Sequence, residues 1–460
     1  MKLDLSTILK YLRELTGFSG VESRSQKAKK NIVFLSIFRG LGMLIGYLMV
    51  PLTIGYLSQT TYGVWITLTS LVGWLSFFDV GLGHGLKNRF AEAVALNDDI
   101  LAKKYVSTTY AIIIIIIASF LVLFYLINPF IDWGVILNVS EDTSLNENLN
   151  IVATIVFTTF GLTFVLQLIN TILNANQQPS KAAFNELLGK ALGFIIILIL
   201  LQTTNGSIVN LSLALSVSPV VVLALVSIFF FNGEYKNYKP TLSYVDFSKT
   251  GILLKLSVKF FIIRISAIFL YSTNNIIIAH LLGPAEVAPY SIAISYFNVL
   301  FLLFNIVVAP FWSAITEAWV KKETLWIKNT MRKLFYFWIV LGSVGGVMLI
   351  LSNFVYEIWI GDVVDIPFIL SLLVCVWVLI TCWNGVYSQF LYGIGAIKIQ
   401  AVVVIVSAVL NIPLAIFLGS IWGISGILLA NIFFAFIQMW IYPLQYSKII
   451  NFEAKGLWVK

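Results

Sequence analysis

Two arginines stand inside long apolar stretches of this sequence, Arg39 in the first and Arg264 near the middle of the chain. A charge at the centre of a membrane-spanning helix costs about 2.5 to 3.5 kcal/mol on insertion scales. Arginine presents a planar, permanently charged fork that binds phosphates and carboxylates through paired hydrogen bonds. The face of Arg264 continues, by helical steps, through Tyr271 and Asn275, as a cavity wall would. Two explanations stay open: the arginines reach the lipid headgroups by snorkelling, or they form an anion-binding site.

The two arginines are 225 residues apart, and two other features recur at the same separation. Residues 56–63, a turn between apolar stretches, fall on residues 281–288, and Glu92 falls on Glu317. Three coincidences at one offset favour an internal duplication, which is common in membrane transporters. Each repeat would contain an even number of helices, so both would enter the membrane in the same sense. This arrangement predicts a pseudo-twofold axis along the membrane normal, with a transport path between the halves.

Three further charged residues within apolar stretches are candidates for binding or ion coupling. Lys190 stands four residues after Glu186, so the two form either an ion pair across one helical turn or a substrate and proton site. Asp79 has no basic residue within one turn of its helix. It is either a proton-handling group in a wet surrounding or the partner of Arg39.

The elements that must position these side chains are helices in a membrane. Hydrophobic residues make up 59% of the 460, and charged residues only 11%, which excludes an ordinary soluble protein. About twelve stretches have the roughly 20 apolar residues that a spanning helix needs. They lie near residues 32–55, 63–85, 105–128, 150–173, 182–202, 208–231, 257–281, 288–312, 334–356, 366–390, 399–418 and 422–444. The sequence therefore predicts an all-α polytopic membrane protein with two six-helix lobes.

The net charge of +8 is a topology signal because of where the basic residues fall. Lys and Arg lie in both termini and in the connections after even-numbered spans, whereas the other connections carry acids such as Glu286 and Asp362. By the positive-inside rule both termini are expected in the cytoplasm. A basic stripe on a folded surface is missing, so nucleic acid is not an expected partner.

The same pattern predicts the domain boundaries. We expect a basic tail at 1–30, an N-lobe at 31–232, a cytoplasmic linker at 233–256, a C-lobe at 257–445 and a cytoplasmic tail at 446–460. The first tail is either an interfacial amphipathic helix or a frayed end.

Motifs for other chemistries are missing from the sequence. It has no GxxxxGK[ST] phosphate loop, only two histidines and no cluster with metal-ligand spacing. Its two cysteines lie within one apolar stretch and form no CxxC motif. We therefore expect no catalytic residue, no metal and no cofactor.

Two blocks near the amino terminus carry a resemblance to a known family. They are 56–65, YLSQTTYGVW, and 74–93, WLSFFDVGLGHGLKNRFAEA. With the helix count and the two same-sense halves, the chain resembles the Wzx-type polysaccharide and O-antigen flippases of the multidrug/oligosaccharidyl-lipid/polysaccharide exporter (MOP) superfamily. The resemblance implies a transporter in the bacterial cytoplasmic membrane. Such a transporter moves undecaprenyl-diphosphate-linked oligosaccharides to the outer leaflet for lipopolysaccharide or other surface polysaccharides, alongside membrane lipids and polymerase machinery.

On this resemblance, the predicted site divides by chemistry. Arg39, Arg264 and Lys190 would bind the diphosphate, and Asp79 and Glu186 would couple protons or ions. Polar residues within the spans would contact sugars, although such residues also bind helix to helix; they are Gln167, Asn170, Asn174, Tyr271, Asn275 and Gln389.

Other functions predict other features. A drug or cation exporter of the same superfamily would need acidic cavity residues and no arginine. A lipid II flippase resembles a longer, fourteen-helix pattern. A membrane polymerase or glycosyltransferase would need a large outer loop with catalytic groups, whereas the outer connections here are short.

Overall fold

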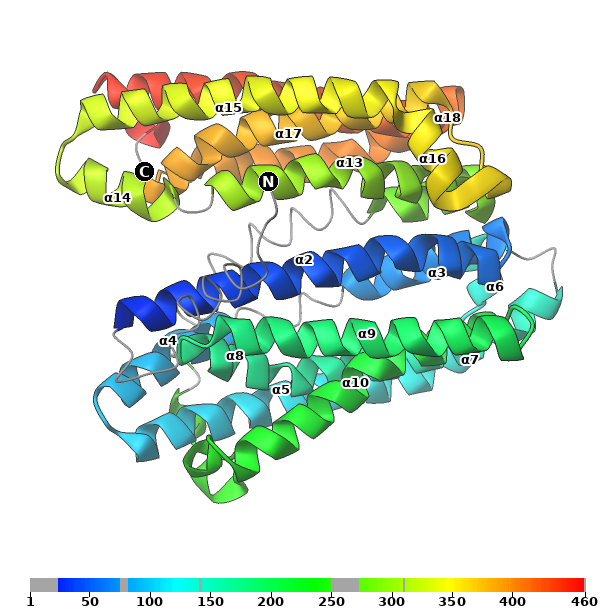
Figure 1. Ribbon diagram of the computed structural model, residues 1–460, viewed down its shortest axis with the longest axis horizontal. Helices are drawn as coiled ribbons and strands as arrows, with labels where there is room; N and C mark the ends of the chain where they lie inside the picture. The colour runs from blue at the N-terminus through cyan, green and yellow to red at the C-terminus, as the bar shows by residue number, and fades with distance from the viewer. Residues whose placement is uncertain are drawn as a thin grey trace, which may run out of the picture. The chain divides into compact units, whose positions relative to one another are not determined.

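The computed structural model of the chain describes residues 24–74, 82–139, 143–249, 251, 273–308, 311–396 and 398–458. All regular structure in these ranges is helical (Figure 1). Nine of the helices described there are long and apolar enough to cross a membrane. The prediction of an all-α polytopic membrane protein is confirmed. Runs of β-branched residues such as 112–117 are helical because a helix satisfies its backbone groups internally in lipid.

The longest helix, α18 (Lys398–Ile450), is two spans joined at a sharp turn. Its 53 residues would extend about 80 Å, against a hydrocarbon core of about 30 Å. The backbone leaves the helical region at Trp422 and Gly423. Gly423 has φ of +59°, a conformation that glycine adopts without the usual penalty. The predicted boundary between spans 399–418 and 422–444 falls at this turn.

Contacts divide the chain into two compact units. The first unit comprises Met1–Leu52, Phe78–Ile131 and Ile151–Val258. Its helices are most of α2 (Arg24–Tyr56) and α7 (Thr143–Leu166), with α4 (Leu82–Ala95), α5 (Asp99–Ile127), α8 (Leu168–Ala175), α9 (Pro179–Thr203) and α10 (Ile208–Asn232). Helices α9 and α10 pack along each other, and α4 packs on α5 and α8. A buried apolar cluster fills the space between them and includes Leu86, Phe90, Val106, Ile169 and Leu173.

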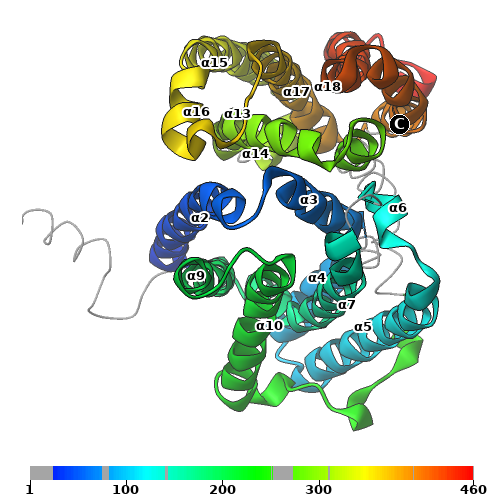
Figure 2. The same cartoon turned by 90° about the vertical axis from the view of Figure 1, so that its right-hand side faces the viewer.

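The second unit comprises Thr53–Phe77, Asp132–Asn150 and Lys259–Lys460. It contains α3 (Gln59–Trp74), α6 (Trp133–Leu137), the short helix η6 (Pro284–Glu286), α13 (Val287–Val308), α14 (Phe311–Val320), α15 (Thr324–Ile350), α16 (Ser352–Ile360), α17 (Phe368–Ile394) and α18. Helix α17 packs against α13, α14, α15 and α18 (Figure 2). It is therefore the central helix of this unit, and half of its most apolar stretch is buried.

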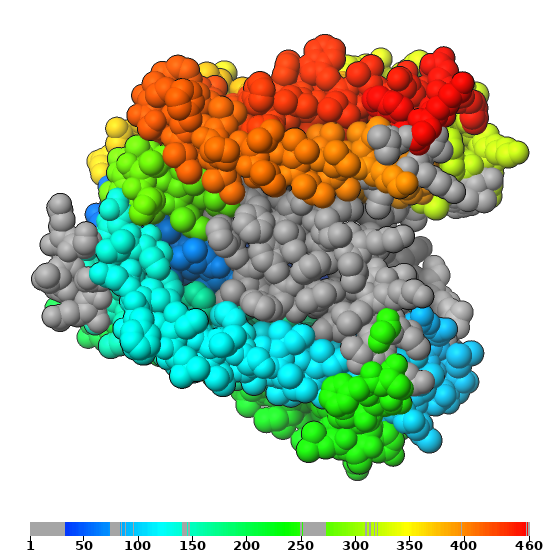
Figure 3. Space-filling model, turned by 180° about the vertical axis from the view of Figure 1, so that it is seen from behind, coloured from blue at the N-terminus to red at the C-terminus, as the bar shows by residue number. Residues whose placement is uncertain are grey.

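The outward faces of the spans are apolar. Helix α18, orange to red in Figure 3, lies on a surface of the second unit. It exposes Val409, Phe417, Phe433 and Trp440, side chains that would be stable against lipid tails but costly in water. A surface of this kind fits a helix bundle in a bilayer.

The connection after α10 folds back onto the first unit. Residues 233–249, which we call the linker strap, contain three short helices: η3 (Lys236–Tyr238), η4 (Leu242–Tyr244) and η5 (Phe247–Lys249). All three contact α5. Most of the predicted linker is therefore packed onto one unit.

Two predicted spans are described only in part. The span at 63–85 appears as α3 up to residue 74 and α4 from residue 82, and the span at 257–281 as a helix at Thr273–Leu282. The described helices agree with a total of twelve. The lobe boundaries stay a prediction, and the amino-terminal tail up to residue 23 lies outside the described residues.

Candidate functional site

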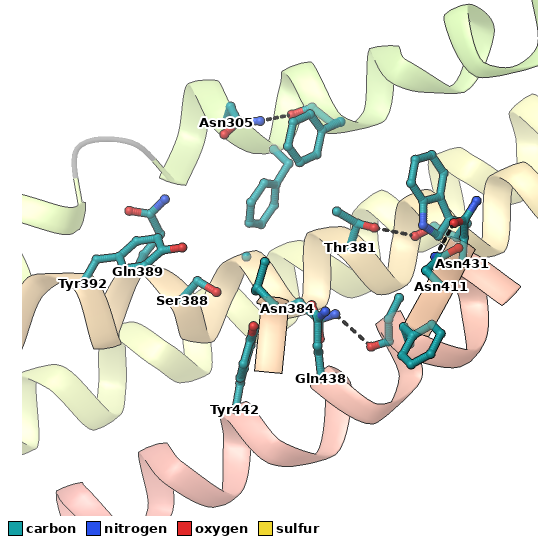
Figure 4. A pocket seen from close by; sticks show the side chains of 17 residues that line it. Asn305, Thr381, Asn384, Ser388, Gln389, Tyr392, Asn411, Asn431, Gln438 and Tyr442 are labelled. Carbon is teal, nitrogen blue, oxygen red and sulfur yellow. Dashed lines mark hydrogen bonds between the residues drawn. The ribbon is translucent and has the colours of Figure 1, made fainter. Parts of the chain in front are cut away.

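Two adjoining cavities lie among the helices of the second unit. The first, which we call the amide cavity, has a volume of about 240 Å³ and lies between α13, α17 and α18 (Figure 4). The second, the Asn275 cavity, has about 400 Å³ and is lined mainly by α13 and α17. Phe301, Trp377 and Thr381 belong to both walls. The two cavities are therefore neighbours in one unit.

Helical spacing brings polar side chains to the amide cavity. On α17, Trp377, Thr381, Asn384 and Ser388 follow one another by three or four residues and so share one face. The second arm of α18 adds Gln438 and other residues from its own face, which reaches toward α17 (Figure 4). An otherwise apolar pair of helices thus presents its amides to a common space.

Two asparagines of this cavity each form a hydrogen bond, within the described chain, through only one end of the side-chain amide. Asn384 donates through Nδ2 to the Ala435 carbonyl at 2.9 Å. Asn431 accepts at Oδ1 from Asn411 Nδ2 at 2.7 Å. Their opposite atoms, Asn384 Oδ1 and Asn431 Nδ2, are buried and have no hydrogen-bond partner among the described residues. Each amide is thereby fixed in orientation while one polar atom is left without a partner there.

Two more amides with a buried, unpartnered oxygen line these cavities. Gln389 Oε1 lies in the wall of the amide cavity, and Asn275 Oδ1 in that of its neighbour. Asn275 is oriented by a bond of 2.9 Å from its Nδ2 to Ser70 Oγ on α3. A buried polar group without a partner costs about 1 to 3 kcal/mol. The four open atoms together favour filling of the cavities by water or by a ligand with hydroxyl or amide groups.

Neither cavity has a charged residue among the side chains that line it in the described part of the chain. The remaining wall is aromatic, with Phe301, Trp377, Tyr392, Phe434 and Tyr442. Apolar and aromatic walls with a few fixed polar groups are typical of binding sites for small organic ligands. This arrangement suits an uncharged, polar ligand.

The structure places two predicted cationic residues on contacting helices of the first unit. Lys190 Nζ on α9 donates to the Gly42 carbonyl on α2 at 3.4 Å. The rings of Phe38 and Phe184 also join these helices, with centroids 5.0 Å apart. Arg39 is exposed and lies one helical turn before Gly42, about 4.5 Å along the axis. Arg39 and the Lys190 ammonium therefore belong to the same region of this unit.

Other predicted site residues are placed differently or not described. Within the described residues, Glu186 is exposed and makes no ion pair with Lys190 at 4.0 Å or less. Arg264, Tyr271 and Asp79 lie outside the described residues. The roles assigned to these side chains, and to Lys190, stay predictions.

The predicted sugar contacts divide into two groups. Asn275 and Gln389 line the cavities of the second unit. Asn170 is buried in the first unit, where its Oδ1 accepts from Asn185 Nδ2 at 2.8 Å and joins α8 to α9. In that unit too, Gln167 is exposed at the break between α7 and α8, and Asn174 is half-buried.

Several cavity residues were not among the sequence candidates, notably Asn384, Asn411, Asn431 and Gln438. The available signal was the presence of polar residues at helical spacing inside apolar spans, Asn384 and Ser388 on one and Asn431, Gln438 and Tyr442 on another. Such residues are equally common as helix-to-helix contacts. Sequence alone could not separate the two uses.

Comparison with known proteins gives matches over most of the chain. A protein named "Putative O-antigen transporter" from Salmonella typhimurium is 26% identical over 401 residues, which cover 85% of this chain and 90% of that protein. A "Putative O-antigen export protein" from Yersinia pseudotuberculosis is 22% identical over 424 residues, or 90% and 94%. No family model matches the sequence.

Solved structures share the fold at low sequence identity. A multidrug resistance MATE family transporter of the MOP superfamily, in an inward-facing conformation, matches with a TM-score of 0.73 and 15% identity, over 92% of this chain and all of that one. A MOP superfamily transporter from Pyrococcus furiosus matches with a TM-score of 0.60 and 16% identity, over 95% and 100%. This chain is therefore a polytopic membrane protein with the fold of the MOP superfamily transporters, and its relatives in sequence carry the name of O-antigen transporters or export proteins.

Proposed function

We propose that this protein moves lipid-linked oligosaccharides from the inner to the outer leaflet of the bacterial cytoplasmic membrane by alternating access. The protein is a transporter and not an enzyme, as its fold and its relatives indicate. The observation that carries the choice of substrate is the amide cavity, an uncharged polar space inside apolar helices. Its four open amide atoms, counted with Asn275, match the hydroxyl groups of a carbohydrate.

The charged end of such a substrate needs a different surface. A diphosphate is bound best by fixed cationic donors, and in the first unit Arg39 and Lys190 lie on the contacting helices α2 and α9. Arg264, at the repeat position of Arg39, would be its counterpart. The polyprenyl tail would stay in lipid, against the apolar outer faces.

The residues that line the two cavities argue against the alternative function, export of drugs or cations. A cationic ligand in a cavity of low dielectric needs an acidic partner. Among the described residues, none that line the two cavities of the second unit is acidic. The lining therefore favours a neutral, hydroxyl-rich ligand.

Contacts between the two repeated turns support the internal duplication. Gln59 Nε2 donates to the Ala285 carbonyl at 3.1 Å, and Gly63 packs directly against Pro284. At the offset of 225, Pro284 corresponds to Gln59 and Ala285 to the next residue. Residues near a twofold axis contact their own equivalents, so these contacts agree with a pseudo-twofold relation between the repeats.

Membrane potential favours outward movement of such a substrate. Moving two negative charges outward across a potential that is negative inside gains about 4.6 kcal/mol per 100 mV. Proton coupling through Asp79 or Glu186 becomes useful only if cationic side chains cross the field with the ligand. We propose both residues as the sites to examine for coupling.

The test is leaflet-resolved labelling of undecaprenyl-diphosphate glycans in a strain that lacks this protein and is complemented with variants. Arg39→Ala and Arg264→Ala are expected to insert normally, to abolish surface polysaccharide and to leave lipid-linked units on the inner leaflet. Arg332→Ala, which removes an exposed arginine from α15, is the matched control and should export normally. Normal export by both site variants would overturn the assignment of the anion site. If the strain without the protein accumulates no lipid-linked units, the proposed function is wrong.

A further inference from the structure

We infer that the amide cavity is a subsite for one uncharged sugar residue of the substrate and that it rejects acidic sugars. This inference rests on the proposed function and adds the class of sugar. The cavity of about 240 Å³ lies below the range of about 300 to 1,000 Å³ that is typical of sites for drug-sized ligands. It is thus sized for a single residue of a longer glycan.

The open amide atoms define which groups the cavity can recognise. Asn384 Oδ1 and Gln389 Oε1 are acceptors, and Asn431 Nδ2 is a donor. A sugar hydroxyl or N-acetyl amide can donate to the first two and accept from the third. Because Ala435 and Asn411 hold the other ends of two of these amides, little conformational entropy is lost on binding.

The same atoms disfavour a carboxylate. An anion in this space would lose its water and find no cationic side chain among the lining residues of the described chain. Two of the three open atoms are carbonyl oxygens, which repel it further. Since an uncharged hydroxyl meets neither penalty, the lining selects neutral over acidic sugars.

Aromatic side chains complete the subsite. Trp377, Phe301 and Phe434 line the cavity beside the amides. Flat rings of this kind cover the apolar face of a pyranose while polar groups meet its hydroxyls, the usual division of labour in a site for a small organic ligand.

The experiment is binding of free disaccharides to the purified full-length protein, measured by saturation-transfer NMR. The probes are cellobiose, chitobiose and cellobiouronic acid, which lack both lipid and diphosphate. Wild type should bind at least one neutral disaccharide at least tenfold more tightly than the acid. Asn431→Leu and Gln389→Leu should each weaken that binding about tenfold. Asn237→Leu, a matched change on the exposed linker strap, should leave it unchanged.

A variant that is expected to gain binding separates a loss of the subsite from a failure to fold. Gln438→Arg places a cation in the wall of the cavity and should raise binding of cellobiouronic acid at least tenfold. Equal binding of neutral and acidic probes by wild type, or binding that neither leucine variant weakens, would overturn the subsite. So would absence of binding by every probe. In each case an intact effect of Arg39→Ala on export would leave the proposed function standing, so the two failures can be told apart.

Discussion

At the scale of single residues, buried amides join membrane helices in both units. In the first unit, Asn170 and Asn185 bond to each other across α8 and α9, which is the usual way that polar residues join membrane helices. In the second unit, Asn384 and Asn431 likewise use one end of the amide for a hydrogen bond to the protein. What distinguishes this second pair is a further polar atom on each side chain, which is buried and has no partner among the described residues.

Gly63 is the residue whose replacement should disturb the second unit most directly. A Cβ at Gly63 would overlap the backbone carbonyl of Pro284, and neither backbone can yield as a side chain could. We expect Gly63→Ala to separate α3 from η6 and to destabilise the protein by about 1 to 3 kcal/mol. The measurement is the melting temperature of the protein in detergent.

Gly342 provides the matched control for this prediction. It lies in α15 of the same unit, and a Cβ there would meet no atom within 4 Å. Gly342→Ala should therefore leave the melting temperature unchanged or raise it slightly, because alanine favours a helix by up to about 1 kcal/mol. An equal effect of the two substitutions would contradict the proposed close contact.

At the scale of elements, the linker strap is fastened to the first unit by polar contacts along its length. Tyr238 donates to Asp99 at the start of α5 at 2.7 Å. Further along, the Asp246 backbone donates to Thr108 at 2.9 Å. Such bonds hold residues 233–249 against one unit, so the strap should move with that unit during transport.

The first contact of the strap is the ion pair between Glu234 and Lys181, which a fall in pH should weaken. Glu234 accepts from Lys181 Nζ and Gln178 Nε2, each at 2.6 Å. Burial raises the pKa of Glu234, but these hydrogen bonds and the charge of Lys181 outweigh it and lower that pKa below the ordinary 4.5. A lowered carboxyl pKa means that the stabilisation is present above the unfolded value and is lost as pH falls through the folded one.

Glu234→Gln should therefore loosen the strap at neutral pH only. The pair is about half-exposed, so its loss should cost on the order of 0.5 kcal/mol, about a twofold rise in opening. Hydrogen exchange of residues 234–249 measures this. The ratio of variant to wild type should be about two at pH 7 and should approach one as pH falls below 4.5. Glu453→Gln removes another exposed carboxylate and should change nothing. A ratio that stays constant with pH would contradict the ion pair.

At the scale of the whole molecule, the distribution of charge predicts which connections face the cytoplasm. Exposed Glu286 in the turn before α13 should lie outside, and exposed Lys236 in the linker strap should lie inside. We expect a membrane-impermeant maleimide to label Glu286→Cys in intact spheroplasts and to label Lys236→Cys only after permeabilisation. Cys375 and Cys382 are buried and supply a low background. The reverse pattern would contradict the predicted cytoplasmic termini.

Much of the fold could be predicted from local sequence. The ends of most described spans agree with the predicted ones within a few residues, and the turn at Trp422 and Gly423 lies at the predicted start of the last span. The spans 150–173 and 334–356 are exceptions. In the first, α7 ends at Leu166 and α8 begins at Leu168, with a break at Gln167; the second begins early, as α15 from Thr324, and breaks at Leu351, where α15 gives way to α16. Hydropathy averages over about 19 residues and cannot detect a break of one residue.

The candidate site was accessible to sequence reasoning only in part. Asn275 and Gln389 stood out as polar residues within spans, and both line the cavities. Asn384 and Asn431 did not, since their role depends on what lies across the space between α17 and α18. No pattern within either helix contains that information.

The sequence by itself determined that this chain is a bundle of membrane helices and where most spans begin and end. The physical reason is that the bilayer demands about 20 apolar residues for each span and satisfied backbone groups in all of them. Only the tertiary structure decided which side-chain amide atoms form hydrogen bonds between helices and which are buried without a partner. The reason is that a hydrogen bond depends on two atoms being about 3 Å apart. Asn170 and Asn431 read alike in the sequence, and each accepts a hydrogen bond from another asparagine, but the packing around Asn431 places it in a cavity wall with a buried amide nitrogen that has no partner among the described residues.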